Sequence, residues 1–354
     1  MMLAAGSRPI VVVAMSGGVD SSVAAGLLLK SGRQVIGATM WLWGDEMPAS
    51  VQNAQRAAAH LGIPLHVIDL RREFSRQVIQ YLIDEYAHGR TPNPCLACNR
   101  GIKFGRLLTA ARQLGGEVLA TGHYVRNVYR DGRWHLLRGL DRTKDQSYML
   151  YMLGQEELGQ AIFPLGELTK SEVRRLARQW NLPSAEQAES QEICFLPNDD
   201  YRHFLRRYAP ETLRPGPILD SAGREIGRHA GLPLYTVGQR KGLGITSPIP
   251  LYVIGLDAKR NAVIVGPARE LGRRRALAEQ VNYVAGAIPG EPFRATVKIR
   301  YKAIEAEAEV RPAGPAAVEV HFVVPQRDIT PGQGIVFYRE EEVLGGGIIS
   351  ASLP

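Results

Sequence analysis

The sequence predicts an α/β fold with a parallel sheet, followed by two smaller β-rich units. Residues 10–16, "IVVVAMS", form a continuous β-branched run, typical of a strand buried on both faces. Strand and helix patterns then alternate over the first 200 residues, as they do in βαβ units. Helical periodicity ends near Tyr208, where Gly, Pro and alternating strands take over. We therefore expect an α/β domain at 1–200, a small central β-rich domain at 201–270 and a β-barrel-like domain at 271–354.

The elements of the α/β domain follow from their periodicity and end signals. Asp20 opens a helix that Gly32 closes. Thr169 and Glu172, three residues apart, form a capping box that opens a late helix. The dipeptide Asp131-Gly132 predicts a hairpin turn. The remaining expected elements are strands at 34–43, 65–70 and 117–124 and helices at 53–62, 72–89 and 104–114.

The second half reads as strands joined by turns. A hairpin is expected around residues 259–261, because two alternating apolar runs flank a polar turn there. Further strands are expected in "FRATVKIRY", "AAVEVHFVV" and "GIVFYREEEVLGGGII". No internal repeat or low-complexity tract is visible, so the architecture is an α/β body with all-β attachments.

Composition narrows the class of protein. No apolar run approaches the roughly 20 residues that cross a bilayer. The short apolar stretch near the first residue lacks a charged n-region and leads into a Gly turn, so it predicts a strand rather than a signal peptide. We expect a cytoplasmic protein with no membrane partner and with reduced thiols.

Positive charge gathers in the second half. The formal net charge is +8, and Arg and Lys cluster beside Tyr, Phe and Gly. Such clusters suit a phosphate-rich strand whose bases can stack, although solvated turns and protected edge strands would carry them equally well. The clusters are "FLRRY" (204–208), "GQRKG" (238–242), "GRRRA" (272–276) and "KIRYK" (298–302).

Residues 14–22, "AMSGGVDSS", join the first strand to the first helix. Glycines there allow close approach of a ligand to the backbone, and a helix N-terminus points unpaired N–H groups at an anion. The stretch lacks both the Gly-Lys-Ser/Thr ending of a Walker A loop and the G-x-G-x-x-G spacing. It therefore predicts a phosphate site of another kind, with a capped Gly-rich turn as the alternative.

The chain contains three cysteines, and two of them, Cys95 and Cys98, stand close together in "TPNPCLACNR". This Pro-rich stretch predicts a loop, and Cys194 follows far downstream in "SQEICFLP". The count excludes a four-cysteine zinc site, and no histidine lies at ligand spacing from any of the three. Two kinds of sulfur chemistry remain beside plain burial of the thiols. Either one cysteine carries a persulfide and another closes a disulfide, or all three hold a four-iron cluster with one open iron.

The motifs resemble two known groups of proteins. "SGGVDSS" is similar to the pyrophosphate loop of the ATP pyrophosphatase superfamily, also called adenine nucleotide α-hydrolase-like. Further blocks, in order along nearly the whole chain, resemble the bacterial tRNA-specific 2-thiouridylase family. They are "GRTPNPCLACNRGIKF", "ATGHYVR", "RGLDRTKDQSYMLY", "SQEICFLP", "LYTVGQRKGLGI" and "TPGQGIVFY…LGGGII".

This resemblance implies an enzyme. The family uses ATP to adenylate O2 of the wobble uridine, U34, in the anticodon stem-loop of tRNA, and replaces that oxygen with sulfur. It implies ATP and Mg as cofactors, with a 4Fe–4S cluster as an open question, and a cysteine desulfurase or a sulfur-carrier protein as sulfur donor. Two alternatives stay open. One is another ATP pyrophosphatase that acts on a small metabolite, and the other is a non-catalytic RNA-binding iron–sulfur protein.

The resemblance also assigns residues. Cys98 matches the nucleophile and Cys194 the cysteine that bears the persulfide, while Asp20 would meet a magnesium ion. Several family members carry Asp at position 95, so Cys95 is either a stronger iron ligand or a competing thiol. Residues matching ATP-binding positions are Ala14, Met15, Ser16, Gly17, Gly18, Val19, Asp20, Ser21, Ser22, Met40 and Gly122. Those facing the target base are Asn93, Pro94 and Cys95, and those contacting tRNA are His123, Lys144, Asp145, Gln146, Arg300, Tyr301 and Gln333.

Overall fold

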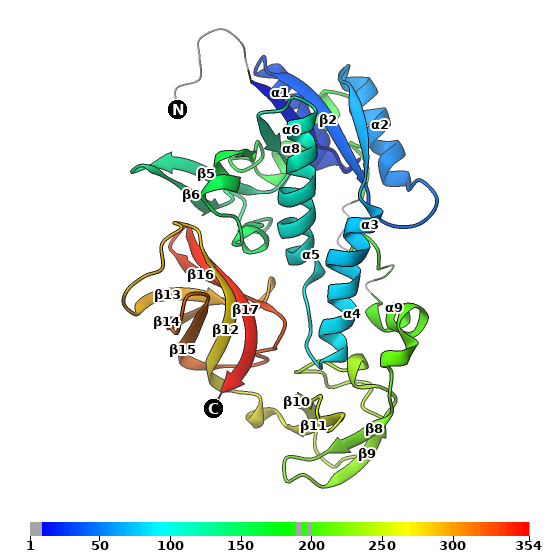
Figure 1. Ribbon diagram of the computed structural model, residues 1–354, viewed down its shortest axis with the longest axis vertical. Helices are drawn as coiled ribbons and strands as arrows, with labels where there is room; N and C mark the ends of the chain where they lie inside the picture. The colour runs from blue at the N-terminus through cyan, green and yellow to red at the C-terminus, as the bar shows by residue number, and fades with distance from the viewer. Residues whose placement is uncertain (1–8, 189–192, 197, 199, 354) are drawn as a thin grey trace.

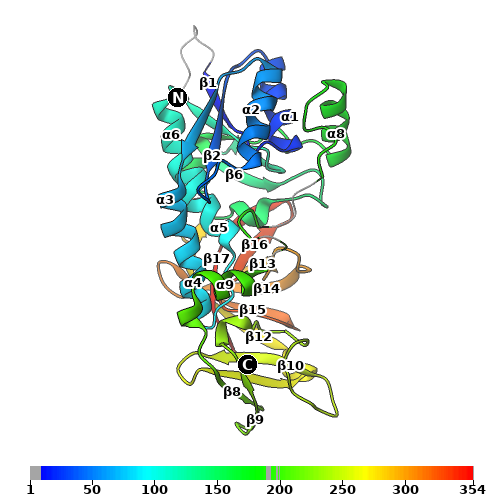
Figure 2. The ribbon, with the colours of Figure 1, turned by 90° about the vertical axis from the view of Figure 1, so that its right-hand side faces the viewer.

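The computed structural model describes residues 9–188, 193–196, 198 and 200–353. Figure 1 shows a body of helices around a sheet at the top, a barrel of strands below it and a small sheet at the lower end. Figure 2, turned by 90°, shows the same order along the long axis. Within the described residues, no helix combines the length and the apolar character that a membrane span needs.

The sheet of the body is parallel, as predicted, with strand order β3-β2-β1-β4-β7. The central strand β1 is buried on both faces because its valines alternate between two cores. Val11 and Val13 pack with helices α1 and α2, whereas Val12 packs against the helix that contains Phe104 and Leu107. The strands are β1 (Ile10–Ala14), β2 (Gln34–Trp41), β3 (Leu65–Asp69), β4 (Val118–Ala120) and β7 (Ala161–Ile162).

The helices of the body include two that contain π-helical stretches. Helix 71–87 is built from α3, η1 and α4, and helix 94–113 from α5, η2 and α6. The second corrects the sequence prediction, because Cys95 and Cys98 lie in its first turns and not in a loop. The helices are α1 (Val19–Lys30), α2 (Ala49–Leu61), α3 (Arg71–Phe74), η1 (Ser75–Ile79), α4 (Gln80–Ala87), α5 (Pro94–Ala97), η2 (Cys98–Leu107), α6 (Leu108–Gln113), η3 (Ser147–Leu150), α7 (Gln155–Gly159) and α8 (Lys170–Gln179).

Two local predictions are confirmed. Strands β5 (Val125–Arg130) and β6 (Arg133–Arg138) form a hairpin, and Asp131 and Gly132 both adopt positive φ in its turn. Thr169 and Glu172 form the capping box of α8.

A small sheet follows helix α9 (Tyr201–Tyr208) and the single turn η5 (Pro210–Thr212). Its strand order is β10-β11-β8-β9, and β10 and β11 form the hairpin expected around residues 259–261. Ile218, Val253 and Val265 fill the core of this small sheet together with Leu232. The elements are β8 (Gly216–Leu219), β9 (Glu225–His229), η6 (Leu232–Leu234), β10 (Leu251–Asp257), β11 (Ala262–Pro267) and η7 (Ala268–Glu270).

The C-terminal strands close into a barrel, as predicted. The strand order runs β12-β15-β14-β13-β16-β17, and β12 also pairs with β17, which closes the ring. Strand β17 in addition pairs with β6, so the hairpin of the body continues the sheet of the barrel. The strands are β12 (Arg273–Tyr283), β13 (Phe293–Lys298), β14 (Ala306–Pro312), β15 (Ala317–Gln326), β16 (Gly334–Arg339) and β17 (Glu342–Leu353).

Candidate active site

The predicted phosphate loop lies between β1 and α1, at the carboxyl edge of the parallel sheet. Ala14 ends β1, residues 15–18 form the turn, and Val19 begins α1. Gly17 adopts φ +79°, and a Cβ there would lie 2.4 Å from the backbone oxygen of Ser50, so only glycine fits. The first N–H groups of α1 have no partner within the helix and point to the site of an anion.

Two hydroxyls stiffen the loop rather than project from it. Ser21 and Ser22 are buried, and their Oγ atoms donate to the carbonyl oxygen of Gly18, at 3.2 and 2.9 Å. The Ser21 hydroxyl also accepts from the backbone N–H of Ser16, at 3.1 Å. Ser16 itself is exposed. The loop is therefore shaped before any ligand binds, with Ser16 as its exposed hydroxyl.

Asp20 stands at the mouth of α1 and is engaged by two residues from elsewhere in the body. Lys170 Nζ donates to both carboxylate oxygens, at 2.7 and 2.8 Å. The Tyr124 hydroxyl donates to Oδ1, at 2.7 Å. The side chain of Asp20 is about one-third exposed, and that of Lys170 is largely buried. A cation thus lies beside the phosphate loop, in a loop motif that has no lysine of its own.

Met40 and Gly122 lie at the ends of the strands on either side of β1. Met40 is near the end of β2 and is half-buried. Gly122 follows β4, and a Cβ there would lie 2.9 Å from the backbone of Asp20 and Ser21. Both positions therefore border the phosphate loop at the carboxyl edge, where α/β proteins bind their ligands.

The three cysteines form no disulfide in this structure, and their thiols lie close enough to influence one another. Cys98 is buried, Cys95 is half-buried and Cys194 is exposed. Burial raises the pKa of the Cys98 thiol to about 12, and Cys194 and Cys95 add to the rise, while Lys103 opposes it. The protein packed around Cys194 raises its pKa too, with a further contribution from Cys95. The structure therefore brings Cys194 into the neighbourhood of the other two, across about a hundred residues of sequence.

The residues before Cys98 form what we call the cysteine segment, residues 91–98. Asn93 caps α5 by accepting a hydrogen bond from Cys95 N at 3.1 Å, and Pro94 occupies the first helical position. Asn93 also contacts the sulfur of Met149 through Nδ2, at 3.9 Å. This start signal, Asn followed by Pro, is what makes the stretch helical.

Whether the protein could hold a metal ion depends on how its potential ligand side chains are arranged. Among the described residues, no three His, Cys, Asp or Glu side chains are arranged to hold one metal ion. The three thiols as placed therefore do not form a preorganised metal site. Asp20 alone suits magnesium, because that ion is commonly held by one or two carboxylates together with the phosphates of a nucleotide.

Three of the residues that match tRNA-contact positions turn toward the protein in this structure. His123 is buried beside Phe104 and Phe163 and shares a 2.7 Å hydrogen bond with Thr121. The Gln146 side chain accepts from the backbone N–H of Tyr124, at 3.0 Å. Burial lowers the pKa of His123 well below its ordinary value, so the imidazole is neutral.

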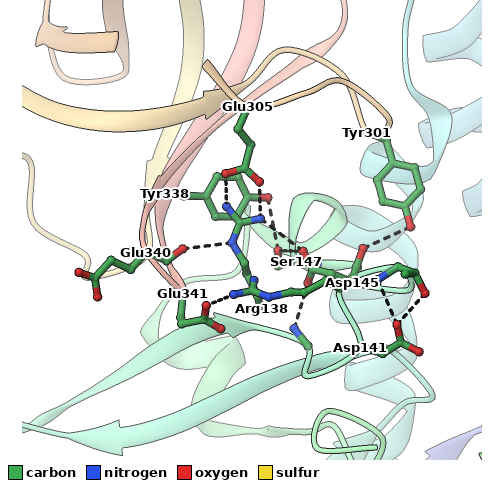
Figure 3. A network of polar contacts seen from close by, with 12 residues as sticks. Arg138, Asp141, Asp145, Ser147, Tyr301, Glu305, Tyr338, Glu340 and Glu341 are labelled. Carbon is green, nitrogen blue, oxygen red and sulfur yellow. Dashed lines mark hydrogen bonds and ion pairs between the residues drawn. The ribbon is translucent and has the colours of Figure 1, made fainter. Parts of the chain in front are cut away.

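Asp145 is the third residue that matches a tRNA-contact position and turns toward the protein. Figure 3 shows it in a polar network between the body and the barrel. Its carboxylate accepts from the Ser147 hydroxyl at 2.8 Å and lies 3.8 Å from the guanidinium of Arg138. Arg138 also donates to Glu305 of the barrel, at 2.7 Å, and stacks over the ring of Tyr338. Lys144, next to Asp145, is half-exposed.

The remaining three residues that match tRNA-contact positions link the barrel to the small sheet and the body. The Tyr301 hydroxyl donates to the backbone oxygen of Asp145, at 3.3 Å. Arg300 donates to the carbonyl oxygen of Val237 beside the small sheet, at 3.2 Å. Gln333 Nε2 donates to the carbonyl oxygen of Thr91, at 2.8 Å. These positions lie where the barrel meets the small sheet and the body.

Sequence reasoning missed Lys170, Tyr124 and Lys103. A signal for Lys170 was present, because the capping box of Thr169 places it at the first position of α8, where the helix dipole disfavours a cation. A lysine there needs an anionic partner, and Asp20 supplies it. Lys103 lies five residues after Cys98 in the π-helical stretch η2, but nothing in the sequence shows that this turn is π-helical.

Comparison with known proteins gives matches along the chain. A family model described as "tRNA methyl transferase HUP domain" matches residues 9–198. The "tRNA methyl transferase PRC-barrel domain" matches 202–267, and the "Aminomethyltransferase beta-barrel domain" matches 273–349.

Three curated relatives carry one name, tRNA-specific 2-thiouridylase MnmA. The relative from Roseiflexus castenholzii is 51% identical over 366 residues, which cover 96% of this chain and 99% of the relative. The one from Chloroflexus aurantiacus is 52% identical over 353 residues, covering 96% and 98%. The one from Symbiobacterium thermophilum is 49% identical over 370 residues, covering 98% and 94%.

Proposed function

The chain belongs to the tRNA-specific 2-thiouridylase family, and we propose that it uses ATP to replace O2 of the wobble uridine of tRNA with sulfur. The observation that carries the proposal is that one domain holds both the phosphate loop and three interacting thiols, Cys95 and Cys98 in the helix 94–113 and Cys194 in a turn after α8. Cys98 and Phe195, the neighbour of Cys194, share one cluster with Met40, which borders that loop. A ligase for a small metabolite needs only the phosphate loop, and a non-catalytic iron–sulfur protein needs only the thiols. This chain combines both.

The first step activates the base. Uridine O2 attacks the α-phosphorus of ATP, the bond to the bridging oxygen breaks, and pyrophosphate leaves. The N–H groups of the first turn of α1 bind the departing phosphates, and Lys170 turns from Asp20 to the same phosphates. Asp20 is then available to magnesium, which would neutralise phosphate charge. Uridine must leave the base stack for this attack, because O2 is not reachable within it.

The second step brings in sulfur. Cys194, exposed at the surface, takes a sulfur atom from a cysteine desulfurase or a sulfur-carrier protein and becomes a persulfide. The terminal sulfur attacks C2 of the adenylated uridine, the C2–O bond breaks, and AMP leaves. Cys98 then attacks Cys194 Sγ and passes its thiol proton to the departing 2-thiouridine, the S–S bond of the persulfide breaks, and a Cys98–Cys194 disulfide is left. A thiol reductant restores both cysteines.

The protonation of Cys98 orders these events. Because burial raises its pKa to about 12, Cys98 is a neutral thiol at neutral pH. A neutral thiol attacks a persulfide slowly, so the sulfur on Cys194 survives until the adenylated uridine arrives. Burial of Cys98 thus protects the intermediate.

Iron content separates this route from a cluster route. Protein purified without oxygen that holds about four irons per chain, lost on replacement of Cys95, Cys98 or Cys194, would make these cysteines cluster ligands. Activity without iron would support the persulfide route and leave Cys95 as a local thiol.

The remaining assignments complete the proposal. The chain divides near residues 200 and 270, and the two β-rich units grip the anticodon stem-loop of tRNA. Asn93, Pro94 and Cys95 face the target base, whereas Lys144, Arg300, Tyr301 and Gln333 meet the RNA where the barrel adjoins its neighbours. The enzyme works in the cytoplasm, where its thiols stay reduced.

The direct test is nucleoside analysis. Unmodified tRNA is incubated with the protein, ATP, magnesium and a persulfide donor, then digested and analysed by mass spectrometry. We expect 2-thiouridine at the wobble position, and none without ATP. A methylated nucleoside in its place would overturn the proposal in favour of the methyl transfer that the family descriptions name.

A further inference from the structure

A turn of the barrel, residues 328–334, lies directly against the start of the cysteine segment. Thr91 N donates to the carbonyl oxygen of Pro331, at 2.8 Å, and Gln333 Nε2 donates to Thr91 O, at 2.8 Å. The Thr91 hydroxyl donates to the hydroxyl of Thr236, at 3.3 Å. Every polar group of Thr91 is thus bonded to the barrel or to the chain beside the small sheet. Figure 1 shows the extended chain that leads from α4 to α5 on the side of the barrel.

Gly332 is the closest point of this contact. It adopts φ +92°, and a Cβ there would lie 2.8 Å from Thr91 N and 2.9 Å from both Thr91 C and Thr91 O. These are backbone atoms, which cannot rotate away as a side chain can. The turn cannot retreat either, because Gly332 N donates to Ile349 O at 2.8 Å and Ile349 N donates to Gln333 O at 2.9 Å.

Hydrogen bonds and packing also fix the rest of the cysteine segment and the residue that follows it. Asn93 accepts from Cys95 N, and Asn99 Nδ2 donates to Met149 O at 2.8 Å. Leu96 fills the space beside Gly334 of the barrel, where a Cβ would lie 2.9 Å from Leu96 Cδ1. A displacement of Thr91 is therefore passed on to Cys98 through a short, hydrogen-bonded stretch.

We infer that this turn of the barrel positions the cysteine segment for sulfur transfer, with Gly332 as a positioning residue that acts through Thr91 on Cys98. The inference rests on the proposed function for its kinetic consequence. The residues proposed to bind ATP phosphates lie on β1, α1, α8 and the turn after β1, whereas Gly332 borders Thr91 and donates to the carbonyl oxygen of Ile349. Sulfur transfer, which needs Cys98 itself in place, should therefore depend on Gly332 much more strongly than adenylation, which involves only the base-facing residues of the segment.

The test compares Gly332→Ala with Gly223→Ala. Gly223 has a similar φ of +82°, and nothing lies within 4 Å of a Cβ built there, so this control has the same backbone strain without the contact. Pyrophosphate release and 2-thiouridine formation are measured with tRNA, ATP and a persulfide donor. We expect Gly332→Ala to lower 2-thiouridine formation about 100-fold, as misplaced reacting groups do, and to lower pyrophosphate release far less. Gly223→Ala should match the wild type in both.

A second readout needs neither activity nor ligand. Alkylation of Cys98 by iodoacetamide is followed by peptide mass spectrometry, with circular dichroism as the check on folding. Since Cys98 is buried, we expect its alkylation to rise about tenfold in Gly332→Ala and to stay at the wild-type rate in Gly223→Ala. Should Gly332→Ala fail to fold, Gln333→Leu removes the donor to Thr91 O and should raise the same rate.

The results distinguish a failure of the inference about Gly332 from a failure of the proposed function. Equal alkylation of Cys98 in wild type, Gly332→Ala and Gln333→Leu would overturn the inference, as would equal losses of pyrophosphate release and thiolation in folded Gly332→Ala. A wild-type protein that forms no 2-thiouridine would refute the proposed function, and the alkylation rates would still decide whether the turn holds the cysteine segment.

Discussion

Lys170 Nζ donates to both carboxylate oxygens of Asp20, at 2.7 and 2.8 Å, across 150 residues of sequence. The pair stands at the first turn of α1, beside the phosphate loop. A cation in this place is suited to a substrate with several negative charges, because Lys170 can exchange the carboxylate for phosphate oxygens without crossing the site.

We expect Lys170→Met to lower tRNA-dependent pyrophosphate release about 100-fold, because it removes a charged donor from the departing phosphates and leaves Asp20 to repel them. The measurement is a coupled pyrophosphate assay under saturating tRNA. Lys30→Met is the matched control, since Lys30 is exposed at the other end of α1. A wild-type rate in Lys170→Met would show that the lysine serves the fold alone.

Asp20→Ala should lose ATP use altogether, since it removes the carboxylate in the first turn of α1 that suits magnesium. Chelation of divalent cations should have the same effect on the wild type, reversed by added magnesium. Pyrophosphate release identifies both losses, and binding of tRNA, followed by gel shift, should be unchanged. Undiminished release after Asp20→Ala would contradict the assignment.

Replacement of the cysteines should separate the two steps. We expect Cys98→Ser and Cys194→Ser each to abolish 2-thiouridine while pyrophosphate release continues, because the phosphate loop contains neither thiol. Cys95→Ser serves as the comparison, and under the persulfide route it should retain thiolation. Nucleoside mass spectrometry and the pyrophosphate assay are run on the same samples, and thiolation by either of the first two variants would remove that cysteine from the mechanism.

His123 should make the protein sensitive to mild acid. Burial keeps its pKa well below the ordinary value of about 6.5, so the folded protein holds a neutral imidazole where the unfolded chain takes up a proton. The unfolded state therefore binds more protons below about pH 6.5, and the free energy of unfolding falls as the pH falls. Burial lowers the pKa of His229 as well, which adds a loss in the same direction.

We expect the melting temperature of the wild type to drop between pH 7 and pH 5, and that of His123→Gln to drop less. Thermal unfolding followed by circular dichroism measures both. His66→Gln, on an exposed stretch of β3, should follow the wild type. If the melting temperatures of the wild type, His123→Gln and His66→Gln fell in parallel with pH, the role assigned to buried His123 would be wrong.

Arg138 should contribute most to the contact between body and barrel. Its guanidinium meets Asp145 and Glu305, and its removal leaves these carboxylates without their cation in a largely buried place (Figure 3). Arg138→Met should lower the free energy of unfolding by about 3–5 kcal/mol. Arg130→Met is the control, because the Arg130–Glu342 pair is half-exposed and should cost less than about 1 kcal/mol. Equal decreases in the free energy of unfolding for the two variants, measured by chemical denaturation, would contradict a stabilising role for the network around Arg138.

Local signals in the sequence were sufficient to predict many strands, turns and helix starts of the body. The β-branched run of β1, the turn at Asp131-Gly132 and the Thr169 capping box each act within a few residues, so each could be predicted. The start of α5 was missed although Asn93 and Pro94 signal it, because the prolines were interpreted as a loop. The capping box signals that Lys170 needs an anionic partner, but nothing local identifies Asp20 as that partner. The contacts of Gly332 likewise join segments that only the complete fold brings together.

The pairing of β6 with β17 has a consequence for the newly made chain. Leu137 leaves the ribosome about 200 residues before its partner Glu342, which at typical rates of synthesis is roughly 10–40 s. During that interval the hairpin presents a bare backbone edge, the feature that draws other strands to it. Arg133 and Arg138, the charged residues at the two ends of β6, make that edge a poor template for pairing with a strand of another chain. Strand β17, twelve residues long, then pairs with both β12 and β6, so neither the barrel nor this edge of the hairpin is complete before β17 has been made.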